Sequence, residues 1–273
     1  MVVVGAFNTI ALIVFTVALC WRLDQIRRHG GGLQAIAMTV SIAALTLAFV
    51  VANHDVSRAI DAVLFTGAQR VAFYAFLSLG VASLIVVFFF GSRGVSRERR
   101  AGLEAVPLVI ALIGLQTTML FTPVDLRTQR VSEMTVRDVG FALFFLIASG
   151  YLVYGFAACV RSVRRFLRVA DGYLRVSLVI VVAGLMLLVV GSLAQILFVL
   201  TGVVGLTGQG WLLPTSTTLS AAGVVAFLIG VSYPMLHAKW NSAMARRRNA
   251  REDRALIPLW SLVTDAIPEV VLP

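Results

Sequence analysis

Long apolar runs alternate with short polar segments along almost the whole chain. Seven of these runs approach the length of about 20 residues that an α-helix needs to cross a bilayer. The last two lie in a tract from Val176 to Ala238, in which 63 residues contain no Asp, Glu, Lys or Arg. The pattern predicts an all-α, polytopic transmembrane helix bundle with seven spans, at about residues 2–20, 33–52, 71–91, 104–121, 139–160, 177–202 and 215–236.

The basic residues predict which way this bundle faces, because Lys and Arg are enriched in the cytoplasmic segments of membrane proteins. The segments after the first, third, fifth and seventh spans hold 18 of the 23 Lys and Arg, and the remaining segments hold five. We therefore expect the N-terminus outside and the C-terminus inside, in a bacterial inner membrane. The uncharged tract then forms a hairpin whose turn, from Gly205 to Trp211, lies outside.

The first outer segment, residues 53–70, has apolar side chains at helical spacing, which predicts a short amphipathic helix at the outer interface. These side chains are Val56, Ile60, Val63 and Leu64. We expect Asp55 or Ser57 to cap this helix. A small ligand or metal site at His54 and Asp55 is the weaker alternative, because two such side chains are too few to hold a metal.

The second outer segment, residues 124–138, is the most polar stretch before the C-terminal tail. It carries three acidic and three basic side chains. Paired charges of this kind are typical of a solvated loop, so a loop is the main prediction. A binding site for a polar ligand is the alternative.

The composition supports the bilayer as the solvent of this chain. Hydrophobic residues make up 59% and charged residues 13%, whereas about 25% of the residues in soluble domains are charged. The net charge of +10 does not indicate nucleic-acid binding, because the basic residues lie in short loops between apolar runs. Cys20 and Cys159 fall near the inner ends of spans, in the reducing compartment, so no disulfide is expected.

The predicted spans contain no Asp, Lys or Arg, and Glu104 lies at a boundary. Ion-coupled carriers usually place ionisable groups inside the membrane, and a retinal Schiff base needs a buried lysine. The only lysine, Lys239, lies outside the spans. No catalytic motif and no metal-binding spacing occurs, so we expect no cofactor, no metal and no enzymatic activity.

The polar side chains that remain at depth lie in the fourth and sixth spans. They are Gln116 and Thr117 in the fourth, and Ser192 and Gln195 in the sixth. Gly191 lies four residues before Gln195 and so on the same helix face. A small residue beside an amide lets another helix approach and form a hydrogen bond worth about 0.6–2 kcal/mol. These five residues predict helix–helix contacts, with a polar spot in a central cavity as the alternative.

Residues 237–273 are predicted to form a basic cytosolic tail. The tail contains a motif made of Pro258, Leu259, Trp260, Val263, Ala266, Ile267, Pro268 and Glu269. This motif resembles the start of the cytosolic domain in an uncharacterised actinobacterial family of seven-span proteins, catalogued as transporters without an established substrate. The segment from His54 to Asp61 resembles the first outer loop of that family. The resemblance implies a soluble domain of unknown function after the motif. This chain stops at Pro273, so we interpret the tail as the start of a truncated or short form of that domain.

Two functions fit these observations. The first is a non-enzymatic module for sensing or for interaction with a partner, which the outside N-terminus, the basic tail and the absence of charge in the spans favour. The second is a small-molecule or lipid transporter, which the resemblance implies, although seven spans do not divide into an inverted repeat. The expected partners are the lipid bilayer and a membrane or cytosolic protein bound through the tail, but no nucleic acid.

Overall fold

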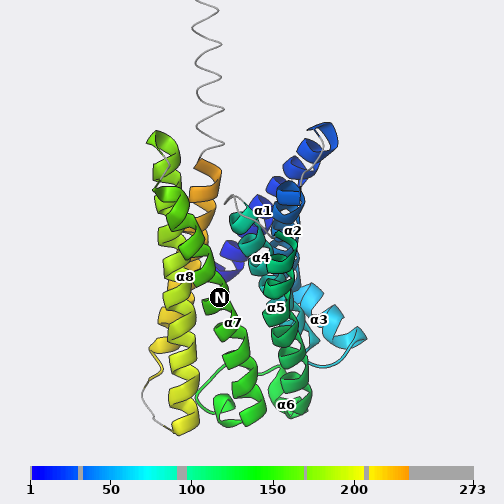
Figure 1. Ribbon diagram of the computed structural model, residues 1–273. Helices are drawn as coiled ribbons and strands as arrows, with labels where there is room; N and C mark the ends of the chain where they lie inside the picture. The colour runs from blue at the N-terminus through cyan, green and yellow to red at the C-terminus, as the bar shows by residue number, and fades with distance from the viewer. Residues whose placement is uncertain (1, 30–32, 91–96, 169–170, 206–208, 234–273) are drawn as a thin grey trace, which may run out of the picture.

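The computed structural model describes residues 2–29, 33–90, 97–168, 171–205 and 209–233, and all regular structure in these residues is helical (Figure 1). The all-α class predicted from the sequence is confirmed. The labelled elements are α1 (Val2–His29), α2 (Leu33–Val51), α3 (His54–Val63), α4 (Ala68–Phe90), α5 (Arg97–Phe121), α6 (Val124–Arg127), the 3-10 helix η1 (Thr135–Arg137), α7 (Val139–Leu167) and α8 (Gly172–Val204). A further helix, Leu212–Tyr233, follows α8.

Several of these helices are long and apolar enough to cross a membrane. In the described part of the chain they are Ala68–Val87 of α4, Val139–Leu167, Gly172–Val204 and Leu212–Tyr233. A fifth results if Ala35–Val51 of α2 and the following α3 count as one span, although the two helices are bent by 87° relative to each other. The apolar part of α5, Ala105–Phe121, is shorter. The helices are therefore compatible with a membrane-embedded protein.

The short amphipathic helix predicted within residues 53–70 is α3. Its N-cap is Asn53, whose side-chain oxygen accepts a hydrogen bond from the backbone N–H of Asp55 at 3.2 Å. The predicted cap at Asp55 or Ser57 is wrong, because the helix begins before either residue. Asn53 has the extended backbone that an N-cap needs, with φ −70° and ψ 139°.

α8 and the helix Leu212–Tyr233 form an antiparallel pair in which small residues face each other at three levels. Successive levels are seven residues apart, a spacing that keeps residues on nearly the same face of a helix. The facing pairs are Ser177 with Gly230, Gly184 with Gly223, and Gly191 with Ser216. Small residues let the two backbones approach closely. The uncharged tract is thus a helical hairpin, and Gly205 ends α8 in the left-handed conformation, with φ +80°.

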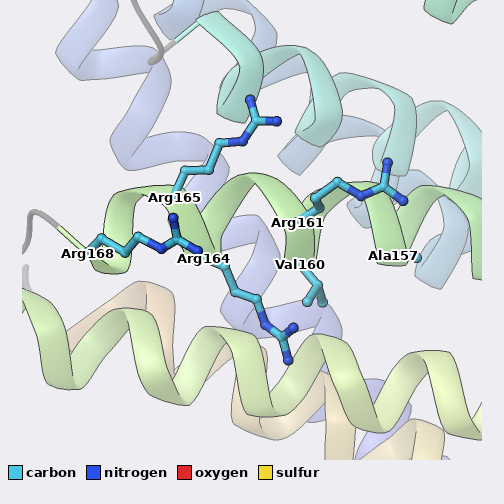
Figure 2. A pocket seen from close by; sticks show the side chains of 6 residues that line it. All are labelled: Ala157, Val160, Arg161, Arg164, Arg165 and Arg168. Carbon is cyan, nitrogen blue, oxygen red and sulfur yellow. The ribbon is translucent and has the colours of Figure 1, made fainter.

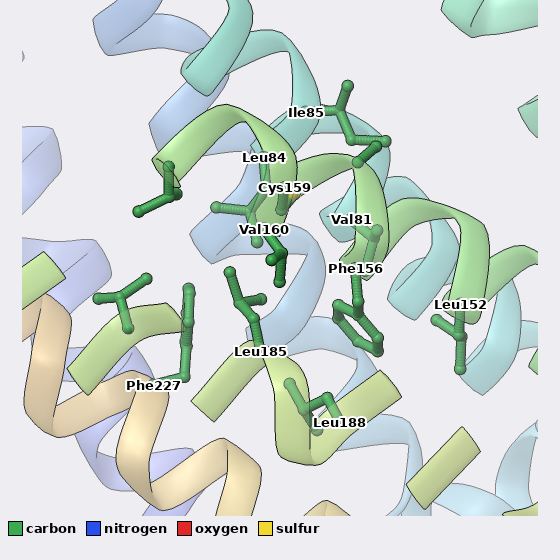
Figure 3. Packing of buried hydrophobic residues seen from close by; sticks show 13 residues of the cluster. Val81, Leu84, Ile85, Leu152, Phe156, Cys159, Val160, Leu185, Leu188 and Phe227 are labelled. Atoms are coloured by element: carbon green, nitrogen blue, oxygen red, sulfur yellow. The ribbon is translucent and has the colours of Figure 1, made fainter. Parts of the chain in front are cut away.

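α7 lies at the centre of the bundle. Of its apolar span, 61% is buried, against 17–39% for the other candidate spans. One core cluster joins α7 to α4, α8 and the last described helix, and Val81, Phe156, Leu185 and Phe227 belong to it (Figure 3). A second cluster surrounds Phe141, Phe144 and Phe145 nearer the start of α7. A smaller cluster packs Phe15 and Leu45 against Leu228 of the last described helix.

The outward faces of the long helices are also apolar. On α5, Val109, Ile110 and Ile113 are 50–65% exposed, and α8 carries a similar row from Val190 to Leu200. Large apolar patches seldom stay exposed on a soluble monomer. This surface suits contact with lipid acyl chains.

Candidate functional site

The five residues predicted to form helix contacts or a polar cavity lie at three separate places. Gly191 lies in the interface of the hairpin, where the Ser216 hydroxyl donates a hydrogen bond to its carbonyl oxygen at 2.8 Å. A Cβ atom at Gly191 would lie 2.6 Å from the Ser220 hydroxyl oxygen and 3.2 Å from the Ser216 carbonyl oxygen, so a larger residue would require the facing helix to adjust. Ser192 follows it along α8 and is buried.

Gln195 connects α8 to α4. Its Nε2 donates to the Tyr74 hydroxyl at 3.4 Å, which is longer than a typical hydrogen bond of about 2.9–3.0 Å. The Tyr74 ring stands edge-on to Phe144 and Phe145, at centroid distances of 5.6 and 5.8 Å. Tyr74 packs against both of the larger core clusters. The amide of Gln195 therefore meets a hydroxyl at the junction of α4, α7 and α8.

Gln116 and Thr117 occupy a different place on α5. The Thr117 hydroxyl donates to the carbonyl oxygen of Ile113 in its own helix at 2.9 Å, and the side chain is exposed. Gln116 is half-buried. Within the described residues, no hydrogen bond joins either side chain to Gln195. The five residues therefore do not come together as one polar cavity.

The segment of residues 124–138 folds back onto the bundle. Val136 is fully buried in the second core cluster. Arg127 donates from Nε to the carbonyl oxygen of Thr122 at 2.8 Å and from Nη2 to that of Leu120 at 2.9 Å. These carbonyls belong to the end of α5, where helical partners run out. Asp125, Arg130 and Arg137 are exposed, as predicted for a solvated loop, while Val136 and Arg127 attach the segment to the bundle as a cap.

Arg70 is a charged side chain in the first turn of α4. The sequence predicts the third span to begin after it, whereas the apolar segment of α4 begins at Ala68. Arg70 Nη2 donates to the carbonyl oxygen of Gln129, and its Cζ lies 5.4 Å from the centroid of the Phe141 ring. Its Nη1 is buried without a hydrogen-bond partner in the described part of the chain. Arg70 thereby links α4 to the segment 124–138 through Gln129, and α4 to α7 through a cation–π contact with Phe141.

The pair His54 and Asp55 does not assemble further ligands. His54 Nε2 lies 2.6 Å from Nη2 of Arg58, one turn further along the exposed α3. No group of three or more metal-binding side chains occurs in the ranges that the structure describes. This end of α3 therefore shows a helix cap and a surface contact.

A pocket of about 330 Å³ lies beside the last turns of α7 (Figure 2). It is lined by Ala157, Val160, Arg161, Arg164, Arg165 and Arg168. The four arginines have the spacing i, i+3, i+4 and i+7, which places them along one stripe of the helix. Figure 2 shows Arg161 and Arg165 extending to one side of α7 and Arg164 extending toward α8.

This arginine pocket is absent from the functional residues predicted from the sequence. Residues 161–175 are predicted as a loop, because the apolar run of the fifth span ends at Val160. In the structure α7 continues to Leu167, so the first arginines of the segment become neighbours on a helix. Their spacing of three and four residues is the signal that could have revealed the pocket.

No protein-family model, curated protein or solved structure matches this chain. The class of protein therefore follows from the fold and the site alone. It is a helical bundle with apolar helices long enough to cross a membrane and an arginine-lined pocket at one end.

Proposed function

We propose that the chain is an integral protein of a bacterial inner membrane that crosses the bilayer seven times, with its N-terminus outside and its C-terminus in the cytoplasm. Four helices have the required length, and α1, α2 and α5 carry the three other predicted spans. α1 ends and α8 begins at the same end of the bundle (Figure 1). The arginines that end α1 and α7 then lie on one side, as the enrichment of basic residues in the cytoplasm requires.

Within this architecture we assign a non-enzymatic role in sensing or in binding a partner. The observation that carries this assignment is the use of interior polar groups as links between helices. The Ser41 hydroxyl donates to the carbonyl oxygen of Gly80 at 2.9 Å, and the Ser177 hydroxyl to that of Gly230 at 2.7 Å. Such bonds hold helices in fixed positions. The basic tail, residues 237–273, is the proposed surface for a membrane or cytosolic partner and lies outside the described residues.

A second candidate function, a small-molecule or lipid transporter, rests on a different observation. The hydroxyls of Ser78 in α4 and Ser149 in α7 are buried and have no hydrogen-bond partner in the part of the chain that the structure describes. A buried hydroxyl without a partner costs free energy. A polar substrate that reached either hydroxyl would supply the missing partner.

A flux measurement separates these two functions. The purified protein is reconstituted in liposomes that contain a pH-sensitive or a sodium-sensitive dye, and the matching pH or sodium gradient is imposed. Pooled amino acids, sugars, nucleosides and organic acids are then added. Because a module of fixed helices provides no path, we expect the gradient to decay at the same rate as in liposomes without protein.

A substrate-dependent acceleration of this decay would contradict the module assignment. The variant Ser149→Ala then gives the control for the alternative. If the acceleration disappears in Ser149→Ala while the amount of reconstituted protein is unchanged, the unpaired hydroxyl belongs to a transport path.

A further inference from the structure

The arginine pocket at the end of α7 concentrates positive charge without compensation in the described residues. Arg161, Arg164, Arg165 and Arg168 all line it. Within the described residues, none of these four arginines forms a salt bridge, whereas Arg28 pairs with Asp24 in α1. Like charges three or four residues apart on a helix repel each other. An anion in the pocket would therefore reduce the repulsion between these arginines.

Two of the six residues that line the pocket are apolar. Ala157 and Val160 precede the arginines along α7, and Val160 is only 6% exposed. The volume of about 330 Å³ lies at the lower end of the range for small-molecule sites. A ligand that suits this lining carries an anionic group, which contacts the guanidinium groups, and an apolar part, which contacts Ala157 and Val160.

The position of the pocket along α7 further limits which ligands it can bind. α7 changes at Val160 from a long apolar segment to basic side chains. In a membrane helix this change marks the boundary between the acyl chains and the headgroups. Basic pockets at such a boundary bind the headgroups of anionic lipids. Guanidinium groups also match phosphate oxygens through paired hydrogen bonds.

Two ordinary causes account for basic residues here but not for the pocket. Arginines near the end of a helix interact favourably with its dipole, and arginines on the cytoplasmic side set topology. Lysine serves either purpose as well as arginine, and neither purpose requires four arginines to line one pocket. A phosphate site in this pocket would use the paired hydrogen bonds that arginine forms and lysine does not.

We propose that the arginine pocket binds the phosphate group of an anionic phospholipid, with the glycerol and the upper acyl chain against Ala157 and Val160. The proposal goes beyond the proposed function, because the arginine pocket would bind this lipid in a transporter and in a sensing or partner-binding module alike. The same phosphate chemistry could come from a soluble phosphate, so the experiment compares the two sources.

The test uses native mass spectrometry of the purified full chain with phosphatidylglycerol, phosphatidylcholine or inorganic phosphate. We expect phosphatidylglycerol to bind several-fold more tightly than phosphatidylcholine. The double variant Arg161→Gln/Arg164→Gln is expected to lose at least about tenfold in affinity for phosphatidylglycerol, because each arginine at the site contributes to headgroup attraction. The charge-conserving variant Arg161→Lys/Arg164→Lys is expected to lose affinity as well, since lysine cannot form the paired bonds.

Arg175→Gln is the matched control, because Arg175 lies in the first turns of α8 and does not line the pocket. It is expected to leave the affinity unchanged. Equal affinity for the two lipids would overturn the proposal. An equal loss of affinity for phosphatidylglycerol in Arg175→Gln and in the double variant would also overturn it. Binding of inorganic phosphate as tight as that of the lipid, and sensitive to the double variant, supports the phosphate site and assigns a soluble source. Thermal midpoints measured without added lipid show whether each variant folds.

Discussion

Replacing Gly184 by alanine is expected to lower the thermal unfolding midpoint of the detergent-solubilised protein by roughly 5 °C. A Cβ atom at Gly184 would lie 2.6 Å from the backbone nitrogen of Phe227 and 2.9 Å from the carbonyl oxygen of Gly223. Both are backbone atoms of the facing helix, so no side chain can rotate away. The two helices of the hairpin must separate, and the small-residue contacts on either side loosen with them.

The matched control is Gly150→Ala, because a Cβ atom at Gly150 has no neighbouring atom within 4 Å. Both substitutions gain the same intrinsic helix preference of about 1 kcal/mol. The difference between the unfolding midpoints of the two variants therefore measures the effect of the close contact at Gly184. Gly150→Ala is expected to keep or raise the midpoint. A midpoint in Gly184→Ala as high as in Gly150→Ala would contradict the hairpin contact.

Replacing Gly155 by alanine is expected to lower the midpoint by a comparable amount, through the contact between α7 and α4. Here the new Cβ atom would lie 2.2 Å from Cγ1 of Val81, and valine has little rotamer freedom in a helix. Because the obstacle is a side chain, its removal should restore the fit. The double variant Gly155→Ala/Val81→Ala is therefore expected to unfold at a higher temperature than Gly155→Ala alone.

The single variant Val81→Ala completes this comparison. It removes methyl groups from the core and is expected to be destabilising by itself, by about 1–2 kcal/mol. The losses of stability caused by Gly155→Ala and by Val81→Ala should be far from additive, since the two residues are in contact. Additive losses in the double variant would show that α4 and α7 do not cross at these residues.

The sequence predicts the helices well because their cause is local. An apolar run of span length needs only its own residues to be recognised, and the hairpin of the uncharged tract follows from such runs. Boundaries are harder to predict. Arg70 lies in the first turn of α4, where Gln129 and Phe141 provide contacts for its guanidinium group. These partners are distant in the sequence, so the charge alone predicts that the helix begins after Arg70.

The candidate site is also harder to predict from the sequence, because its residues contact partners that are distant in the chain. Gln195 stands out as a polar residue at depth, but its partner Tyr74 lies 121 residues away. Tyr74 shows no local pattern that distinguishes it from the other aromatic residues. The arginine pocket depends on the helix extending past Val160, where hydropathy stops being informative. Helical spacing, applied to the basic residues as well as to the apolar ones, would have identified it.

The direction in which α7 and α8 cross the membrane is the central claim, and labelling of single cysteines tests it most directly. Cysteines are placed singly at three exposed residues, in a background of Cys20→Ser and Cys159→Ala. These residues are Thr128 after α6, Asp171 before α8, and Gly210 in the turn after α8. A maleimide that cannot cross membranes is expected to label Thr128→Cys and Gly210→Cys in intact cells, and Asp171→Cys only after the membrane is permeabilised. Labelling of Asp171→Cys in intact cells, or protection of the other two, would contradict the proposed topology.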